Sequence, residues 1–204
     1  MRATLSSLFV ALAACLALAA PTASRADTDP GVAQISAFDD VLLATMKQGA
    51  ALGMNGRYKK LEPAVQRAFD LPTMTRYAIG PAAWAKFSAG DQRALIDAFT
   101  RLSVASFAKN FSSYGGEQFT VDPAADNRGL DKIVKTQLAG SGAPVVLDYR
   151  MRQSGGTWKV IDVLFQGSIS QLTTRRSDLA AVVAAGDPKA IAAHLNAQAD
   201  KLLK

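Results

Sequence analysis

The feature that most constrains the fold is a β-hairpin predicted between Val145 and Phe165. In its first half, large apolar side chains fall on every second residue, the period of a half-buried strand. This apolar set is Val145, Leu147, Tyr149 and Met151. Gly155 and Gly156 reverse the chain, and the return strand is almost wholly apolar, so we expect both of its faces to be covered.

Helical patterns lie before and after the strands. Apolar spacing, prolines and glycines predict helices over about residues 29–49, 62–70, 72–80, 89–114, 168–186 and 188–202. Asp70 and Ser88 occupy cap positions for two of these helices. Period-two patterns over 119–121 and 130–138 add two strands to the hairpin, which gives four strands in sequence. Helices, then strands, then helices indicate an α+β domain with an antiparallel sheet.

The longest predicted helix, Ala89 to Tyr114, carries a stripe rich in aromatic residues. The stripe contains Ile96, Phe99, Ser103, Phe107, Phe111 and Tyr114, with Leu102 beside it. A domain needs such residues for its core, so core packing is the ordinary explanation for each of them.

The amino-terminal segment is typical of a secretory signal peptide. It has an apolar run from Leu5 to Ala20, followed by small residues, and this run is too short to span a bilayer. We expect cleavage after Ala26, which leaves one domain over residues 27–204. The alternative is a lipoprotein signal, because Cys15 follows small residues and an exported protein with this anchor would be acylated there.

Charge and composition exclude several classes of function. Without the leader, 21 Lys and Arg face 17 Asp and Glu, and the basic residues are scattered, which argues against a nucleic-acid partner. A weak attraction to anionic lipid surfaces is compatible with this charge. A mature chain with one histidine, His194, and no cysteine offers no recognisable metal site. We therefore expect no metal and no cofactor.

Four segments together resemble a known family. They are FDLPTMTRYAIGPAAW (69–84), the helix from Asp91 to Tyr114, PVVLDYRM (144–151) and TWKVIDVLFQGSISQLTTRRSDL (157–179). In order and spacing they are similar to the MlaC-type family of periplasmic lipid-binding proteins, also called the toluene-tolerance family, over about residues 35–200. The stretch from Gly167 to Ser177 resembles the hopanoid-associated branch, often labelled HpnM. Leu164 to Gln166 departs from the family pattern, which expects a smaller or more acidic stretch there.

The resemblance implies a monomeric periplasmic carrier that is not an enzyme. It would move phospholipid or a hopanoid-like lipid between the inner and outer membranes and exchange it with membrane-bound transport complexes. The fold implied is a four-stranded curved antiparallel sheet wrapped by about six or seven helices, with a hydrophobic pocket between them. Carried over to this chain, the pocket residues are Tyr77, Trp84, Phe99, Leu102, Phe107, Phe111, Leu147, Tyr149, Met151, Trp158, Val160 and Leu164.

Polar residues near the hairpin leave alternatives open. Arg175 and Arg176 are candidates for contact with a lipid phosphate or an acidic partner, or they form a solvated helix face. Asp162 lies in an apolar strand. The favoured interpretation is a carboxylate hydrogen-bonded to a neighbouring backbone group, to Tyr149 or to an arginine, which fixes the hairpin or the following turn.

Two other functions remain as alternatives. An isomerase or hydrolase with a deep pocket would use Asp162, Tyr149 or His194, although the sequence offers no clear second catalytic group. A periplasmic adaptor with a filled core would bind no ligand.

Overall fold

The computed structural model describes residues 28–204. The predicted leader over residues 1–26, its cleavage site after Ala26 and Cys15 lie outside the described residues. The helices are α1 (Pro30–Met46), α2 (Gly49–Ala68), α3 (Leu71–Ile79), α4 (Pro81–Trp84), α5 (Ala89–Asn110), α6 (Gln171–Ala184) and α7 (Pro188–Leu203). Within this part of the chain, no helix is both long and apolar enough to cross a membrane.

The strands form one curved antiparallel sheet. They are β1 (Gln118–Val121), β2 (Asp126–Arg128), β3 (Asp131–Val134), β4 (Thr136–Ala139), β5 (Val145–Ser154), β6 (Thr157–Phe165) and β7 (Ile169–Ser170). β5 is central, because it pairs with β3 and β4 along one edge and with β6 along the other. β1 and β2 extend the sheet beyond β4 and β3, and β7 pairs with β6.

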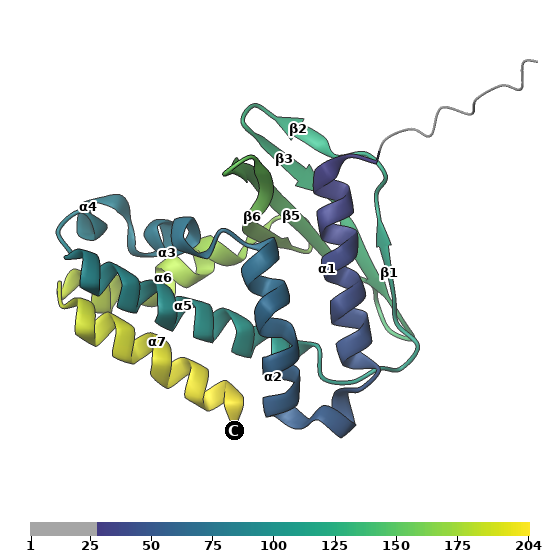
Figure 1. Ribbon diagram of the computed structural model, residues 1–204, viewed down its shortest axis with the longest axis horizontal. Coiled ribbons are helices and arrows are strands. Elements are labelled where there is room, and N and C mark those ends of the chain that lie inside the picture. Colours follow the sequence, from purple (N-terminus) through teal and green to yellow (C-terminus); the bar gives the residue numbers. More distant parts are fainter. Residues whose placement is uncertain (1–27) are drawn as a thin grey trace, which may run out of the picture.

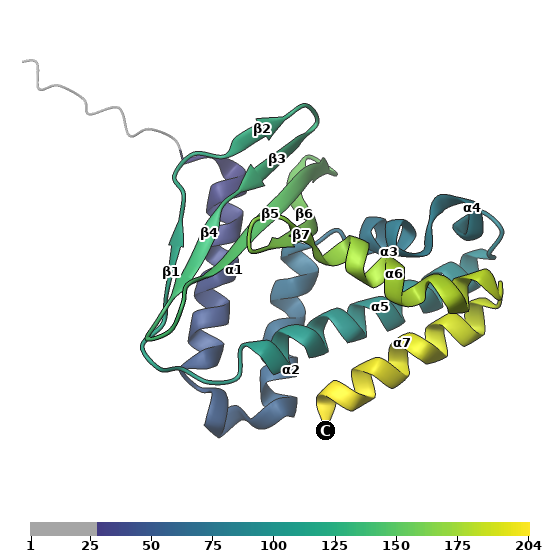
Figure 2. The ribbon, with the colours of Figure 1, turned by 180° about the vertical axis from the view of Figure 1, so that it is seen from behind.

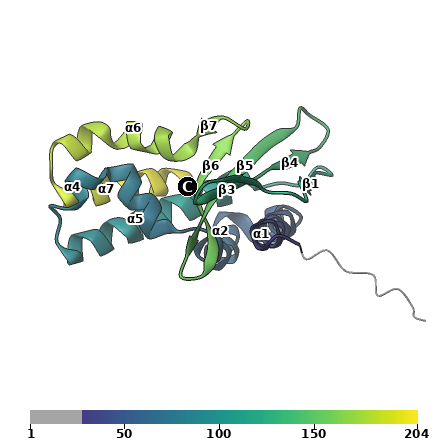
Figure 3. The ribbon, with the colours of Figure 1, turned by 90° about the horizontal axis from the view of Figure 1, so that it is seen from above.

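The helices fall into two groups around the sheet. α1 lies along one face of the sheet with α2 next to it, whereas α3 to α7 extend to one side (Figure 1). The reverse view shows the opposite face of β1, β4, β5 and β3 (Figure 2). Seen from above, α1 and α2 lie beneath the sheet, and α4 to α7 form a separate layer beside it (Figure 3). α5 connects the two groups, since it packs on both α2 and α7.

The α+β class and the antiparallel sheet are confirmed, but the predicted number of four strands is wrong. The strand expected over 130–138 is two strands, because the ladder breaks at Lys135. At this break the Thr136 hydroxyl donates to the Leu147 carbonyl over 2.7 Å. β2 and β7 are short, and β2 consists of polar residues, so neither carries an alternating apolar pattern that the sequence could reveal.

A β-bulge interrupts the pairing of β5 with β6. Arg150 faces Asp162 and Met151 faces Val160, so Ile161 is the extra residue. An extra residue reverses which side chains of a strand face inward. As a result, Val160 is fully buried before the bulge, whereas Val163 and Phe165 line a cavity after it.

The cap predictions are confirmed and two helix boundaries are wrong. Asp70 accepts a hydrogen bond from the Thr73 amide at the start of α3, and Ser88 accepts one from the Asp91 amide at the start of α5. α5 ends at Asn110 rather than at Tyr114. α2 begins at Gly49 rather than at residue 62, and it continues through a kink at Gly53, whose φ of 59° suits glycine.

Asp162 joins the sheet to α6. Its side chain accepts hydrogen bonds from the Val163 amide (2.8 Å), the Leu172 amide (3.0 Å) and the Ser170 hydroxyl (2.6 Å). Ser170 in turn caps α6 by accepting from the Thr173 amide. The favoured interpretation of Asp162 as a structural carboxylate is therefore confirmed. Of the partners considered, it bonds backbone groups rather than Tyr149 or an arginine, and it fixes the turn that follows the strand.

Replacing Asp162 with alanine should destabilise the protein. The substitution leaves two backbone amides and the Ser170 hydroxyl without their acceptor, and we expect the free energy of unfolding to fall by about 2–3 kcal/mol. Urea unfolding followed by circular dichroism measures this change. Asp97→Ala, at an exposed position on α5, is the matched control and should change stability by less than about 0.5 kcal/mol. Equal stability of the two variants would contradict the structural role of Asp162.

Candidate functional site

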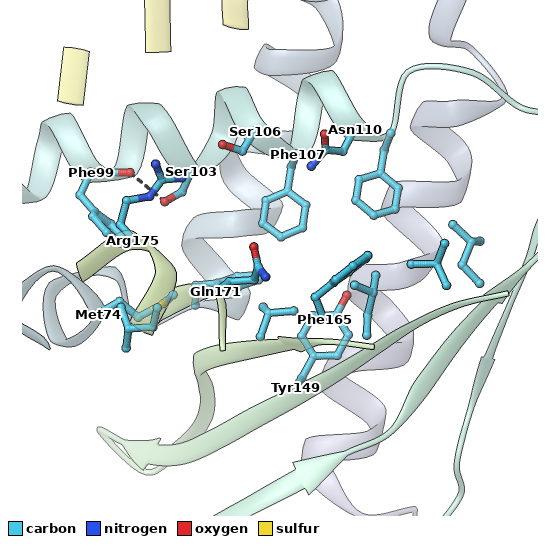
Figure 4. A pocket seen from close by; sticks show the side chains of 17 residues that line it. Met74, Phe99, Ser103, Ser106, Phe107, Asn110, Tyr149, Phe165, Gln171 and Arg175 are labelled. Atoms are coloured by element: carbon cyan, nitrogen blue, oxygen red, sulfur yellow. Dashed lines mark hydrogen bonds between the residues drawn. The ribbon is translucent and has the colours of Figure 1, made fainter. Parts of the chain in front are cut away.

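A cavity of about 450 Å³ lies between the inner face of the sheet, α5 and the start of α6 (Figure 4). This volume is within the range of small-molecule sites, about 300–1,000 Å³. β4, β5 and β6 supply aliphatic and aromatic walls through Leu138, Val145, Leu147, Tyr149, Val163 and Phe165. α5 supplies the opposite wall, on which residues three and four apart face the cavity.

Aromatic rings from several elements pack together along this side of the cavity. Phe69 and Phe107 meet edge to face with their ring centroids 5.4 Å apart, and Phe38 contacts both rings from behind. Phe111 stacks on Phe107 at 5.9 Å. Each of these pairs adds to the stability beyond the burial of its apolar area.

Polar side chains from α5 and α6 also line the cavity. They are Ser103, Ser106, Asn110, Gln171 and Arg175 (Figure 4). Ser103 and Ser106 donate to the carbonyl groups of Phe99 and Leu102 within α5, which allows these hydroxyls to face an apolar space without loss of hydrogen bonds. The cavity therefore has aromatic and aliphatic walls on the sheet and on α5, and a polar side at the start of α6, where Gln171 and Arg175 lie with Ser103 of α5.

Tyr149 connects the cavity to a buried carboxyl group. Its ring lines the cavity, and its hydroxyl donates to Asp39 Oδ1 over 3.2 Å. Asp39 is 2% exposed, and its Oδ2 atom has no hydrogen-bond partner. Burial raises the pKa of Asp39 to about 8, against the opposing effect of the Tyr149 hydrogen bond, with a further increase from Asp40. Burial also raises the pKa of Tyr149 well above its ordinary value, so Tyr149 stays neutral.

Arg175 is the charged residue of the polar side. Its guanidinium donates to Gln198 Oε1 over 2.9 Å, and the side chain is 27% exposed. Burial lowers the pKa of Arg175, which Asp178 partly offsets. A guanidinium remains charged in proteins, so the lowered pKa indicates a desolvated cation rather than a neutral group.

The structure brings about half of the predicted pocket residues together. Phe99, Phe107, Phe111, Leu147 and Tyr149 line the cavity, and Arg175 lies at its polar side. Whether these residues bind a lipid stays a prediction.

The other predicted residues lie outside this cavity. Leu102, Met151 and Val160 are buried in the core. The Tyr77 hydroxyl accepts a hydrogen bond from Arg152, and the Trp158 ring lies 3.9 Å from Lys132 Nζ, next to a smaller hollow of about 250 Å³. Trp84, Leu164 and Arg176 also do not line the cavity.

Sequence reasoning missed several lining residues for identifiable reasons. Val163 and Phe165 follow the bulge, and no pattern in the sequence predicts a bulge at this position. Phe69 and Met74 come from the segment between α2 and α3, where short helices hide the periodicity. Ser106 and Asn110 lie on the same face of α5 as Ser103. The presence of Ser103 within the aromatic stripe could therefore have indicated that this face also carries polar residues.

The three residues considered for catalysis do not meet. Tyr149 lines the cavity, but Asp162 is bonded to the start of α6, and His194 lies exposed on α7, where Gln198 contacts its Nε2 atom at 2.8 Å. Among residues 28–204, no group of three or more His, Cys, Asp and Glu side chains could hold a metal ion.

Comparisons with known proteins agree with this architecture. A family model described as MlaC protein matches residues 36–197. A solved structure of a phospholipid-binding protein from Ralstonia solanacearum, in complex with a phospholipid, is similar with a TM-score of 0.74 and 23% sequence identity. The similarity covers 86% of this chain and 100% of that chain. A search of curated proteins found no match.

The buried Asp39 should make stability fall as pH rises. Unfolded Asp39 loses its proton near pH 3.8, whereas the folded group keeps it up to about pH 8. Between these values only the folded state holds the proton, so the free energy of unfolding decreases by up to about 1.4 kcal/mol per pH unit. Asp39→Asn should remove this contribution, and Asp97→Asn, at an exposed position on α5, should keep it. Urea unfolding at pH 5 and pH 8 measures the difference, and equal slopes for Asp39→Asn and the wild type would contradict the burial effect.

Proposed function

This chain belongs to the MlaC family, and from that membership and its cavity we propose that it is a lipid-binding carrier. The observation that carries the proposal is the cavity of about 450 Å³, with aromatic and aliphatic walls from the sheet and α5 and a polar side at the start of α6. Such a division suits an amphipathic molecule, whose chains need apolar walls and whose head group needs polar contacts.

Simple energetics explain why a carrier is needed. An acyl chain exposed to water costs about 0.8 kcal/mol for each CH₂ group, so a lipid with two chains does not cross an aqueous space unaided. A carrier offsets this cost by burial and needs no chemical step. The walls formed by Phe107, Phe111, Leu147 and Tyr149 supply such burial.

The proposed setting is the periplasm, which the chain would reach through the predicted leader. There it would shuttle phospholipid, or a hopanoid-like lipid, between the inner and outer membranes and exchange it with membrane-bound transport complexes. The structural neighbour from Ralstonia solanacearum is itself a phospholipid-binding protein, which supports a phospholipid as the first cargo to test.

The arrangement of the titratable groups favours a carrier over an enzyme. Tyr149 is tied to Asp39, and neither Asp162 nor His194 lines the cavity. General acid–base chemistry needs a group within hydrogen-bond reach of the reacting atoms. A carrier needs no such catalytic group.

Filling the cavity should abolish lipid binding while the fold remains. In Ser106→Trp an indole would enter the space next to Phe107. We expect the variant to lose most of the lipid that the wild type retains, because the apolar walls are then occupied. Denaturing extraction followed by mass spectrometry measures the lipid per protein, both after expression with the leader and after incubation with phospholipid vesicles.

The control is Ala94→Trp, at an exposed position on the same helix, which should keep the wild-type load. Circular dichroism shows whether both variants fold. A folded Ser106→Trp variant with an unchanged lipid load would contradict the assignment of this cavity as the lipid-binding site. Wild-type protein that is recovered empty and takes up no lipid would instead favour the adaptor alternative.

A further inference from the structure

We propose that Arg175 binds the phosphate of the lipid and thereby selects phosphate-bearing lipids over uncharged lipids with the same chains. This inference rests on the proposed carrier function. It assigns a specificity-determining residue to one side of the cavity and separates the two cargo classes, since a hopanoid-like hydrocarbon without phosphate would gain nothing from this contact.

The first observation is the incomplete neutralisation of Arg175. Its direct hydrogen bond goes to the neutral amide oxygen of Gln198. The neighbouring carboxylate, Asp178, is 3.9 Å away and its side chain is 49% exposed. A charge pair at this distance, with one exposed partner, contributes little. A mostly buried cation with such weak compensation is a favourable site for an anion.

The second observation is the position of this cation relative to the apolar walls. Arg175 and Ser103 lie at one end of the cavity, whereas Phe107 and Tyr149 lie farther along it (Figure 4). A lipid with its chains against the aromatic rings would place its phosphate between α5 and α6. The remaining exposure of Arg175 leaves room for water around a phosphate, so the anion would not be fully desolvated.

The third observation is the geometry of the guanidinium. Gln198, on α7, accepts from one terminal nitrogen, Nη1, and so holds the planar group in place. The remaining N–H groups are available in a fixed fork, which matches the oxygen atoms of a phosphate. Gln198 is therefore a positioning residue for this contact.

The adjacent arginine provides an internal comparison. Arg176 is exposed and does not line the cavity. Its Nη2 atom lies against α3 and α4, near Gly80. Two neighbouring residues of α6 thus carry the same charge, but only Arg175 reaches the proposed site.

The experiment compares two lipids with identical acyl chains. Delipidated protein is incubated with neutral detergent micelles that contain equimolar phosphatidylglycerol and diacylglycerol, and the bound lipids are quantified by mass spectrometry after gel filtration. The wild type should retain phosphatidylglycerol over diacylglycerol by about tenfold or more, as expected for charge-assisted hydrogen bonds. Arg175→Gln should bring the ratio close to one, whereas Arg176→Gln should keep the wild-type ratio.

Each other outcome overturns the inference in a distinct way. A wild-type protein that binds both lipids equally retains the carrier function and loses the role of Arg175. Equal loss of preference in Arg175→Gln and Arg176→Gln would indicate general surface charge. Binding of inorganic phosphate to lipid-free protein, lost in Arg175→Gln while the lipid ratio stays unchanged, would assign the site to the free ion. Failure of the wild type to bind either lipid contradicts the carrier function itself.

Folding of the variants does not limit the test. The wild-type ratio alone decides whether phosphate is selected. Arg175→Lys keeps the charge but presents a point donor in place of the fork, so we expect a preference between those of the wild type and Arg175→Gln.

Discussion

Edge-to-face packing of four aromatic rings is the contact on which the rest of the structure depends. Phe38 on α1, Phe107 on α5 and Tyr149 on β5 converge with Phe69, which follows α2, and their ring centroids lie 5.2–6.5 Å apart. Rings of this size hold the backbone elements at a distance that small side chains would not. α5 is therefore kept away from the sheet, and the space beyond Phe107 is the cavity.

The same contact places a hydroxyl group where no water reaches it. Tyr149 is fully buried, and its partner Asp39 is neutral below about pH 8. Replacing both polar groups by apolar ones of the same shape would remove the desolvation cost. The fold thus keeps a polar pair behind an otherwise apolar wall, and this pair fixes the orientation of the Tyr149 ring.

Much of the fold was accessible from the sequence because its signals are local. The caps at Asp70 and Ser88 depend on residues close together in the chain, and the structure confirms them. The α5 stripe placed Phe99, Phe107 and Phe111 on one wall for the same reason. In β5 the predicted alternation holds only from Tyr149 to Met151, because Asp148 is buried as well.

The remaining features depend on contacts between distant segments. The break at Lys135 involves Leu147, eleven residues after Thr136. The orientation of Arg175 is set by Gln198 on another helix. The predicted pocket residue Met151 is buried next to Gly31 of α1, and Val160 is buried before the bulge at Ile161. No periodicity within a single strand encodes either contact.

The bulge at Ile161 has a consequence for how proteins with this fold can diverge. Before the bulge, Val160 is part of the core, and substitutions there affect whether the chain folds. After the bulge, Val163 and Phe165 border empty space, and substitutions there change the shape of that space at little cost in stability. One strand therefore combines a segment that the core requires with a segment that shapes the cavity. A few residues near the end of β6 can thus differ while the sheet stays the same.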